Sequence, residues 1–289
     1  MTTLLERIES TILPADQVGI LTEAQIQFNK NRNVGFGNVV ILAGGAGSGK
    51  GFTLSQLIGL EGKVLDVDAV KQLAIKVPKI NRALVDAFGP EANSPDFLRT
   101  PKNVSNLHVF LKDQGIIDKR EAVLWQSIAQ AAPDRKPNLI FDVTLKDLTK
   151  VVNISNTLQE LGYKPEKIHL VWVLNDLKIA LDQNAKRSRV VPEDILRATH
   201  MGASSTVFHL IQKSKDFQKF INGDWYISFN RAKIDVELAK SESGGAYILN
   251  ADYAQLKTAG KPINTKQIGT DLLNKIKMIV PNPEIWNLG

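Results

Sequence analysis

The chain contains no cysteine in its 289 residues. Disulfide bonds, thiolate metal sites and cysteine nucleophiles are therefore excluded, and folding does not depend on an oxidising compartment. The sequence also lacks an apolar run of the ~20 residues that span a bilayer, and Met1 to Arg7 lack the basic segment and apolar core of a signal peptide. We expect a cytoplasmic protein without a membrane segment.

Acidic residues are the minority among the charges, with 30 Asp and Glu against 36 Lys and Arg, a net charge of +6 and a pI near 9.3. Such a balance favours an anionic partner, which includes nucleotides, phosphorylated metabolites and the backbone of DNA or RNA. Residues 178–219 hold eight basic and four acidic residues. A solvated helical face explains this local excess as well as a polyanion-binding surface does.

Five short apolar runs rich in strand-forming residues predict the framework of the fold. They are residues 39–43, 64–67, 139–142, 168–174 and 225–229. None alternates strictly between polar and apolar residues, which is typical of parallel strands that are buried on both faces. Each gap is long enough for a crossover helix. The sequence therefore predicts an α/β protein with a doubly wound, mostly parallel five-stranded sheet and flanking helices.

The domain organisation that we expect has a core over residues 35–250, with a helical extension before it (1–34) and another after it (251–289). Within the core, residues 72–137 exceed the length of a simple crossover and predict a mostly helical insertion. Residues 184–205 are expected to form a lid region. No internal repeat or low-complexity tract interrupts this plan.

A glycine-rich segment follows the first predicted strand and precedes a helical stretch, which is the order that a phosphate-binding loop (Walker A motif) requires. It reads Gly44-Gly45-Ala46-Gly47-Ser48-Gly49-Lys50-Gly51-Phe52. The glycines permit a tight turn whose N–H groups point at phosphates, and Lys50 is expected to bridge the β- and γ-phosphates. We therefore predict a P-loop NTPase fold in which Gly45, Ala46, Gly47, Ser48, Gly49, Lys50, Gly51 and Phe52 bind ATP.

Gly51 and Phe52 depart from the usual motif, because Ser or Thr normally follows the lysine and gives its hydroxyl to Mg²⁺. Adenylate-kinase-like enzymes carry Gly at the same place, so Gly51 resembles that branch more than GTPases or motor ATPases. We expect Mg²⁺ to be held through water instead.

Carboxylates follow two of the predicted strands. Asp68 lies just after the second strand and is our candidate base for an acceptor hydroxyl, with Lys71 one helical turn away to contact an anionic substrate. Asp142 ends the third strand as a Walker B residue would, and is our candidate for holding Mg²⁺. Helix capping is the alternative role for Asp68, as a strand-end cap is for Asp142. Thr144 either contacts substrate or, as we favour, caps the next helix in a capping box with Asp147.

Arg187 and Arg189 follow a predicted helix that begins after Asp176, and they precede Pro192. Arginines in such a lid can close over a triphosphate and stabilise the charge on the transferring group. A solvated helix end is the alternative. The four histidines have no metal-ligand spacing, and we assign them no chemistry.

Taken together, four motifs look like those of the zeta-toxin and polynucleotide-kinase-like group of P-loop kinases. They are the loop 44–51, Asp68-x-x-Lys71, Ile140-Phe141-Asp142-Val143-Thr144 and Asn184-x-x-Arg187-x-Arg189-x-x-Pro192. The resemblance spans about residues 38–230. It implies that Asp68 activates the acceptor hydroxyl, that Arg187 and Arg189 contact ATP phosphates, and that a phage is one source of such a chain.

Three residues depart from that group's pattern. Lys71 stands where Arg is usual, Gly51 replaces Ser or Thr, and Asp142 stands where zeta toxins often have Glu. These departures weaken the case for the nucleotide-sugar substrate of zeta toxins.

The expected activity is that of an ATP-dependent phosphotransferase with an alcohol group as acceptor. The basic charge favours a nucleic acid hydroxyl, at a 5′ end or on a hydroxymethylated base, while a mononucleotide or a nucleotide sugar stays open. A non-catalytic ATP-binding switch is a further alternative. So is a haloacid-dehalogenase-like phosphatase, because Asp66-Val67-Asp68-Ala69-Val70 matches that signature, although the preceding phosphate loop disfavours it.

Overall fold

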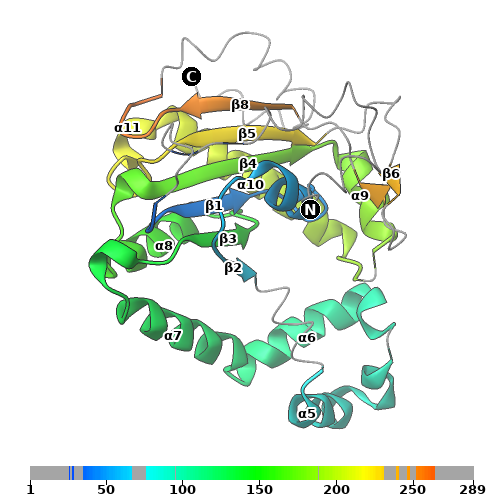
Figure 1. Ribbon diagram of the computed structural model, residues 1–289. Helices are drawn as coiled ribbons and strands as arrows, with labels where there is room; N and C mark the ends of the chain where they lie inside the picture. Colours follow the sequence, from blue (N-terminus) through cyan, green and yellow to red (C-terminus); the bar gives the residue numbers. More distant parts are fainter. Residues whose placement is uncertain are drawn as a thin grey trace, which may run out of the picture.

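A computed structural model gives the fold of the chain (Figure 1). The structure describes Ile26, Phe28 and residues 35–66, 76–94, 96–187, 189–230, 239–240, 246–247 and 252–263. The predicted helices over residues 1–32 and 264–279 therefore lie outside the described residues, apart from Ile26 and Phe28. Ile26 forms a parallel bridge with Ile58.

A six-stranded sheet in the order β2-β3-β1-β4-β5-β8 forms the centre of the molecule. Its strands are β1 (Val39–Ala43), β2 (Lys63–Asp66), β3 (Leu139–Val143), β4 (Ile168–Asn175), β5 (Trp225–Asn230) and β8 (Asp252–Lys257). The first five are parallel and confirm the five predicted strands, while β8 pairs antiparallel with β5. The expected five-stranded sheet is thus corrected to six, because residues assigned to a helical extension form an edge strand. A separate hairpin joins β6 (Ala239–Lys240) to β7 (Ala246–Tyr247).

The centre of the sheet is buried on both faces, as the apolar runs predicted. Alternate residues of β1 enter different clusters. Val39 and Ile41 pack with helices α7 (Ile116–Ala129), α8 (Leu148–Glu160) and α10 (Glu193–Gln212), whereas Val40 and Leu42 pack with Leu57 and with the N-terminal residues Ile26 and Phe28. Because successive side chains of a strand point to opposite faces, this division places one layer on each side of the sheet.

The helices of the core follow the strands. They are α3 (Lys50–Phe52), continued by a π-helical turn (Thr53–Leu57), α8 (Leu148–Glu160), α9 (Leu177–Ala185), α10 (Glu193–Gln212) and α11 (Ser214–Phe217). Asp176 caps α9 as predicted, since its Oδ1 accepts from Lys178 N at 2.7 Å. The predicted capping role of Thr144 is wrong: Asp147 is the N-cap of α8 and its Oδ1 accepts from Thr149 N at 2.7 Å. The helix starts later because Leu145, at φ 51°, has a left-handed backbone.

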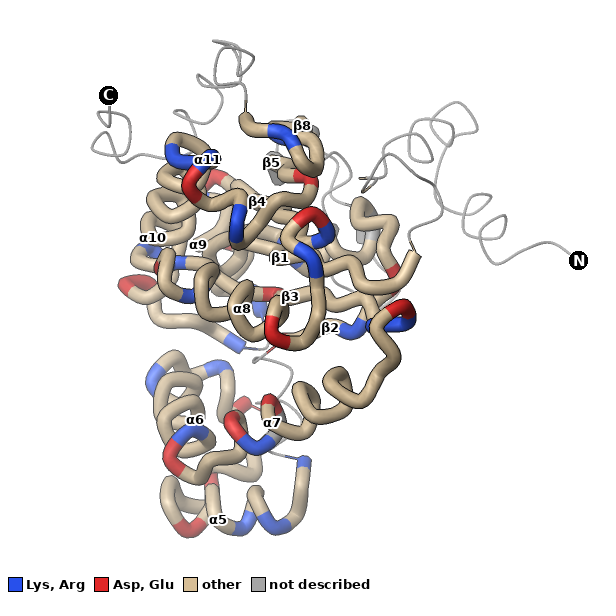
Figure 2. The backbone as a smooth tube through the Cα atoms, turned by 90° about the vertical axis from the view of Figure 1, so that its left-hand side faces the viewer, with Lys and Arg blue, Asp and Glu red and all other residues tan. Residues whose placement is uncertain are grey.

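Between β2 and β3 the described residues form three α-helices that project below the sheet in Figure 1. They are α5 (Pro78–Phe88), α6 (Pro101–Asp113) and α7 (Ile116–Ala129), with short 3₁₀ turns at Pro90–Asn93, Phe97–Arg99 and Pro133–Arg135. α5 and α6 have a small hydrophobic cluster of their own, which includes Leu84, Leu107 and Leu111. Basic and acidic residues are mixed along these helices (Figure 2).

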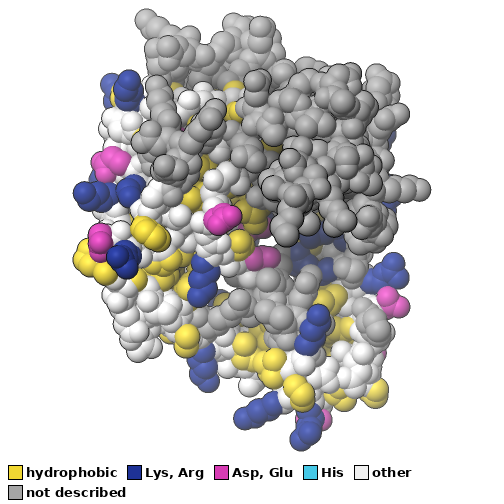
Figure 3. Space-filling view, viewed as in Figure 1, with side chains coloured by type: hydrophobic (Ala, Val, Ile, Leu, Met, Phe, Trp, Pro, Cys, Tyr) yellow, Lys and Arg dark blue, Asp and Glu magenta, His cyan; other side chains and the backbone are white. Residues whose placement is uncertain are grey.

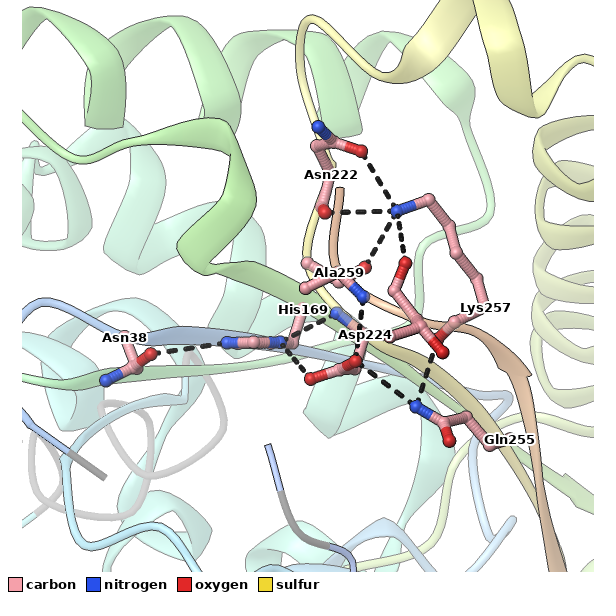
Figure 4. A network of polar contacts seen from close by, with 9 residues as sticks. Asn38, His169, Asn222, Asp224, Gln255, Lys257 and Ala259 are labelled. Atoms are coloured by element: carbon pink, nitrogen blue, oxygen red, sulfur yellow. Dashed lines mark hydrogen bonds and ion pairs between the residues drawn. The ribbon is translucent and has the colours of Figure 1, made fainter. Parts of the chain in front are cut away.

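A buried polar network lies at the amino ends of the strands, opposite the phosphate loop (Figure 4). Asp224 donates its backbone N–H to His169 Nδ1 at 2.9 Å and accepts from Ala259 N at 2.8 Å. Lys257 donates to Asn222 O and Gly223 O, both at 3.0 Å. These bonds fix β8 to the loop before β5.

Among the described residues, no helix combines the length and the apolar composition needed to cross a bilayer.

Candidate functional site

The phosphate loop lies at the carboxyl end of β1, between the central strands of the sheet. The chain leaves β1 toward one edge and β4 toward the other, so the loop occupies a topological switch point, where ligands of open α/β sheets bind. Gly47 and Gly49 have φ values of 76° and 94°, which only glycine adopts without strain. Gly44 is needed for space instead, because a Cβ there would lie 2.7 Å from Val173 O.

The Lys50 ammonium group lies inside the loop. Its Nζ donates to Gly44 O at 2.8 Å and to Gly45 O at 3.2 Å, and it lies 3.8 Å from Asp142 Oδ1. Both charged side chains are mostly buried, at 13% and 20% exposure. The loop lysine and the predicted Walker B carboxylate, 92 positions apart in the sequence, are therefore neighbours.

Asp142 also lies beside a second carboxylate, that of Asp66 on the neighbouring strand β2. In the parallel register, Asp142 of β3 is the partner of Leu42 in β1 and of Asp66 in β2. Mg²⁺ binds through one or two carboxylates together with substrate phosphates rather than in an all-protein cage. Accordingly, the part of the chain that the structure describes has no cluster of three metal-ligating side chains. The donor set of this sheet edge fits a phosphate-bound Mg²⁺.

Two residues of α10 hold the loop at Ala46. The Ala46 N–H donates to Thr199 Oγ1 at 3.1 Å, and His200 Nε2 lies 2.7 Å from Ala46 O. A carbonyl oxygen only accepts, so His200 Nε2 carries the proton. Burial lowers the pKa of His200, and the charge of Lys50 lowers it further against the opposing effect of the hydrogen bond to Ala46. His200 belongs to no recognisable motif, and no local sequence pattern predicts a contact across 154 positions.

A third contact comes from the end of β4, where Asn175 Nδ2 donates to Gly47 O at 3.2 Å. The carbonyl oxygens of Gly44, Gly45, Ala46 and Gly47 are thus all engaged by side chains of the protein. His200 and Asn175 belong to other elements, so the carbonyls of Ala46 and Gly47 are held from outside the loop.

The predicted lid arginines differ in their surroundings. Arg187 is exposed after α9, whereas Arg189 is buried. The segment next to them is fixed, because the Asn184 side chain donates to Val191 O at 2.7 Å and accepts from Val191 N at 3.0 Å. Val191 packs in one cluster with Ala46 of the phosphate loop, so the lid segment lies against that loop.

Of the other predicted residues, Asp68 and Lys71 lie outside the described residues. Thr144 is half-buried just after β3. Phe52 is half-buried in α3, and Gly51 is exposed with no heavy atom within 4 Å of a Cβ placed on it. Figure 3 shows the surface hollowed between the sheet and the insertion helices, with charged side chains of both signs around the hollow.

Comparison with known proteins gives distant structural similarity alone. No protein-family model and no curated protein matches the chain. A chain from the complex of AvrRxo1-ORF1 with AvrRxo1-ORF2 and ATP is 13% identical, with a TM-score of 0.44 over 84% of this chain and 64% of that one. The match therefore spans less than two thirds of the length of the AvrRxo1 chain. A chain of the PezAT chromosomal toxin-antitoxin system of Streptococcus pneumoniae is 11% identical, with a TM-score of 0.40 over 94% of both chains.

The chain itself is a mixed α/β protein with a six-stranded, mostly parallel sheet and flanking helices. Its glycine loop after a central strand is consistent with the predicted P-loop fold.

Proposed function

We propose that this protein is an ATP-dependent kinase that transfers the γ-phosphate of ATP to a hydroxyl group of a nucleic acid, at a 5′ end or on a hydroxymethylated base. The observation that carries the proposal is the position of Lys50, in a preorganised glycine loop and 3.8 Å from Asp142. A cation and a carboxylate at the switch point of the sheet match the needs of a triphosphate with its metal ion.

In this reaction the acceptor oxygen attacks the γ-phosphorus while the bond from that phosphorus to the bridging oxygen of ADP breaks. Asp68 takes the proton of the acceptor hydroxyl, and Lys50 neutralises the phosphate oxygens. Arg187 and Arg189 contact the phosphates from the lid side, and Lys71 and Thr144 contact the acceptor. Asp142 would hold Mg²⁺, which would supply further neutralisation of the triphosphate.

The net charge of +6 and the basic segment 178–219 support a nucleic acid as the acceptor. The test is incubation of the protein with γ-labelled ATP, Mg²⁺ and separate pools of DNA, RNA, mononucleotides and nucleotide sugars. We expect label in a nucleic acid pool. Label in the nucleotide-sugar pool alone would replace the acceptor by a zeta-toxin-like one, and ATP binding without transfer to any pool would favour an ATP-dependent switch.

Variants of three residues distinguish binding from transfer. Lys50→Ala is expected to abolish ATP binding, whereas Asp68→Asn keeps binding and loses transfer, since its amide cannot accept the proton. Asp86→Asn is the matched control, because Asp86 is exposed on α5, and it is expected to keep both. Unchanged transfer by Asp68→Asn would remove that residue from its assigned role.

A further inference from the structure

We infer that Thr199 and His200 are positioning residues for the ATP-binding loop: together they hold both polar groups of Ala46 and thereby set the loop's shape. This inference rests on the proposed ATP binding. Thr199 Oγ1 donates to Leu196 O at 2.8 Å, so its lone pairs are directed at the Ala46 N–H. His200 Nε2 donates to Ala46 O at 2.7 Å.

The ring of His200 also explains one glycine of the motif. A Cβ on Gly45 would lie 2.6 Å from His200 Nε2 and closer still to two carbons of the ring. The φ angle of Gly45 is not in the left-handed region, unlike those of Gly47 and Gly49. Residue 45 is therefore glycine because the imidazole packs flat against it, and the pair Gly45 and His200 forms a single fitted contact.

Helix α10 is well placed to carry this contact because it is anchored on two further sides. Leu196, one turn before His200, packs in a cluster with Val191 of the lid segment and with Ala46. Half a turn after His200, the helix lies close to the loop that follows β3 in the sequence. A Cβ on Gly202 would lie 2.9 Å from Lys146 O of that loop. The helix therefore joins the lid, the loop after β1 and the loop after β3, which together form the candidate site.

The test measures the dissociation constant of a fluorescent ATP analogue with Mg²⁺, and the thermal midpoint, for a set of variants. Removing a partner of a buried hydrogen bond weakens the function that depends on it by about tenfold. We expect this loss for His200→Ala and Thr199→Val, with the thermal midpoint lowered by only a few degrees. His200→Gln and Thr199→Ser are expected to restore binding to within about threefold, because they keep the donor and the hydroxyl.

His209→Gln is the matched control on the same helix. His209 lies nine residues further along, with its ring 6.1 Å from that of Phe217, and we expect it to leave ATP binding unchanged. If wild-type protein binds ATP but His200→Ala and Thr199→Val bind equally well, the inference is overturned while the proposed function stands. Equal losses for His200→Ala and His200→Gln would also overturn it. If wild-type protein binds no ATP, the proposed function fails first.

A double-mutant cycle tests the fitted contact directly. Gly45→Ala is expected to weaken ATP binding by about tenfold or more in the wild-type background, because the new methyl group displaces the imidazole. In the His200→Ala background the same change is expected to add less than about twofold, because the space is then open. Additive losses in the double variant would show that Gly45 and His200 act independently and would contradict the inference.

Discussion

Gly51 leaves open the place where P-loop proteins usually carry a hydroxyl for Mg²⁺. It is exposed, and a Cβ at this position meets no heavy atom within 4 Å. Gly51→Ser is therefore expected to fold normally and to lower the Mg²⁺ concentration needed for half-maximal ATP binding by about fivefold, equivalent to about 1 kcal/mol. Mg²⁺ titration with a fluorescent ATP analogue measures the shift.

Gly51→Ala separates the hydroxyl from the backbone effect. Both substitutions favour a helical backbone over glycine by up to about 1 kcal/mol, but only serine adds an oxygen ligand. An equal Mg²⁺ shift for Gly51→Ala would mean that helix propensity, and not ligation, is the cause.

His169 makes stability sensitive to acid. Its ring is buried and its Nδ1 accepts the Asp224 N–H, so the contact of 3.6 Å between Nδ1 and Asp224 Oδ2 is not an ion pair at neutral pH. Burial, assisted by Lys257 and Lys167, lowers the pKa of His169 from 6.5 to about 3. Between pH 6.5 and pH 3, His169 binds a proton in the unfolded chain but stays neutral in the folded chain. The free energy of unfolding therefore falls as the pH drops from 6.5 to 3, by up to about 5 kcal/mol.

Urea unfolding at pH 7 and pH 4 measures this dependence. His169→Gln has no titrating ring, so its stability is expected to fall much less between the two pH values, even though it starts lower. His108→Gln, on the exposed side of α6, serves as the control and is expected to keep the wild-type dependence. Parallel pH profiles for wild type and His169→Gln would assign the acid sensitivity to other groups.

Asp147 rather than Thr144 starts helix α8, and the two residues can be separated by mutation. Asp147→Ala removes the acceptor for Thr149 N and is expected to cost about 1 kcal/mol of stability. Thr144→Ala is expected to leave the helix start intact and, under the proposed function, to weaken acceptor binding. Urea unfolding measures the first effect and the Michaelis constant for the acceptor the second. The reverse pattern would restore Thr144 as the cap.

The strands and helices show which elements a sequence pattern can predict. Strands β1 and β4 are apolar because both of their faces are buried, and the apolar runs of all five parallel strands were predicted. Strand β8 was not predicted, because its sequence, Asp252-Tyr-Ala-Gln-Leu-Lys257, contains no apolar run. It is held instead by edge pairing with β5 and by the bonds of Lys257 to Asn222 and Gly223. Those partners lie more than thirty positions away.

The same distinction applies to the candidate site. The loop from Gly44 to Lys50 was predictable because its conformation is encoded in consecutive residues. The nearness of Asp142 to Lys50 followed from the rule that parallel strands end at one edge. Thr199, His200 and Asn175 were not predictable, because they reach the loop from α10 and β4 through contacts that depend on packing. The sequence was therefore enough to predict the position of the glycine loop, but not the residues that hold it in place.

At the scale of the whole molecule, helix α7 connects the hydrophobic cluster of the insertion with the cluster on the sheet. Its first turn, Ile116 and Ile117, packs on the cluster of α5 and α6, and its last turns, Leu124 and Ile128, pack on the sheet. Leu107 is fully buried in the first cluster. Leu107→Ala is therefore expected to cost about 2–5 kcal/mol of local stability. Amide exchange should accelerate in α5 and α6 and remain slow in β1 and β4.

The exchange of the Val190 amide tests whether this opening reaches the segment between α9 and α10, which we predict to be a lid. Its N–H donates to Leu98 O at 3.1 Å, and Leu98 belongs to the same cluster as Leu107. When the insertion opens in the Leu107→Ala variant, the Leu98 carbonyl moves away from the Val190 N–H. The Val190 amide is therefore expected to exchange faster, together with the amides of α6. Val109→Ala, on the exposed side of the same helix, is the matched control, with an expected effect within about 0.5 kcal/mol. A Val190 amide that stays protected while α6 opens would mean that the segment after α9 is held from the sheet side alone, through Asn184 and Val191.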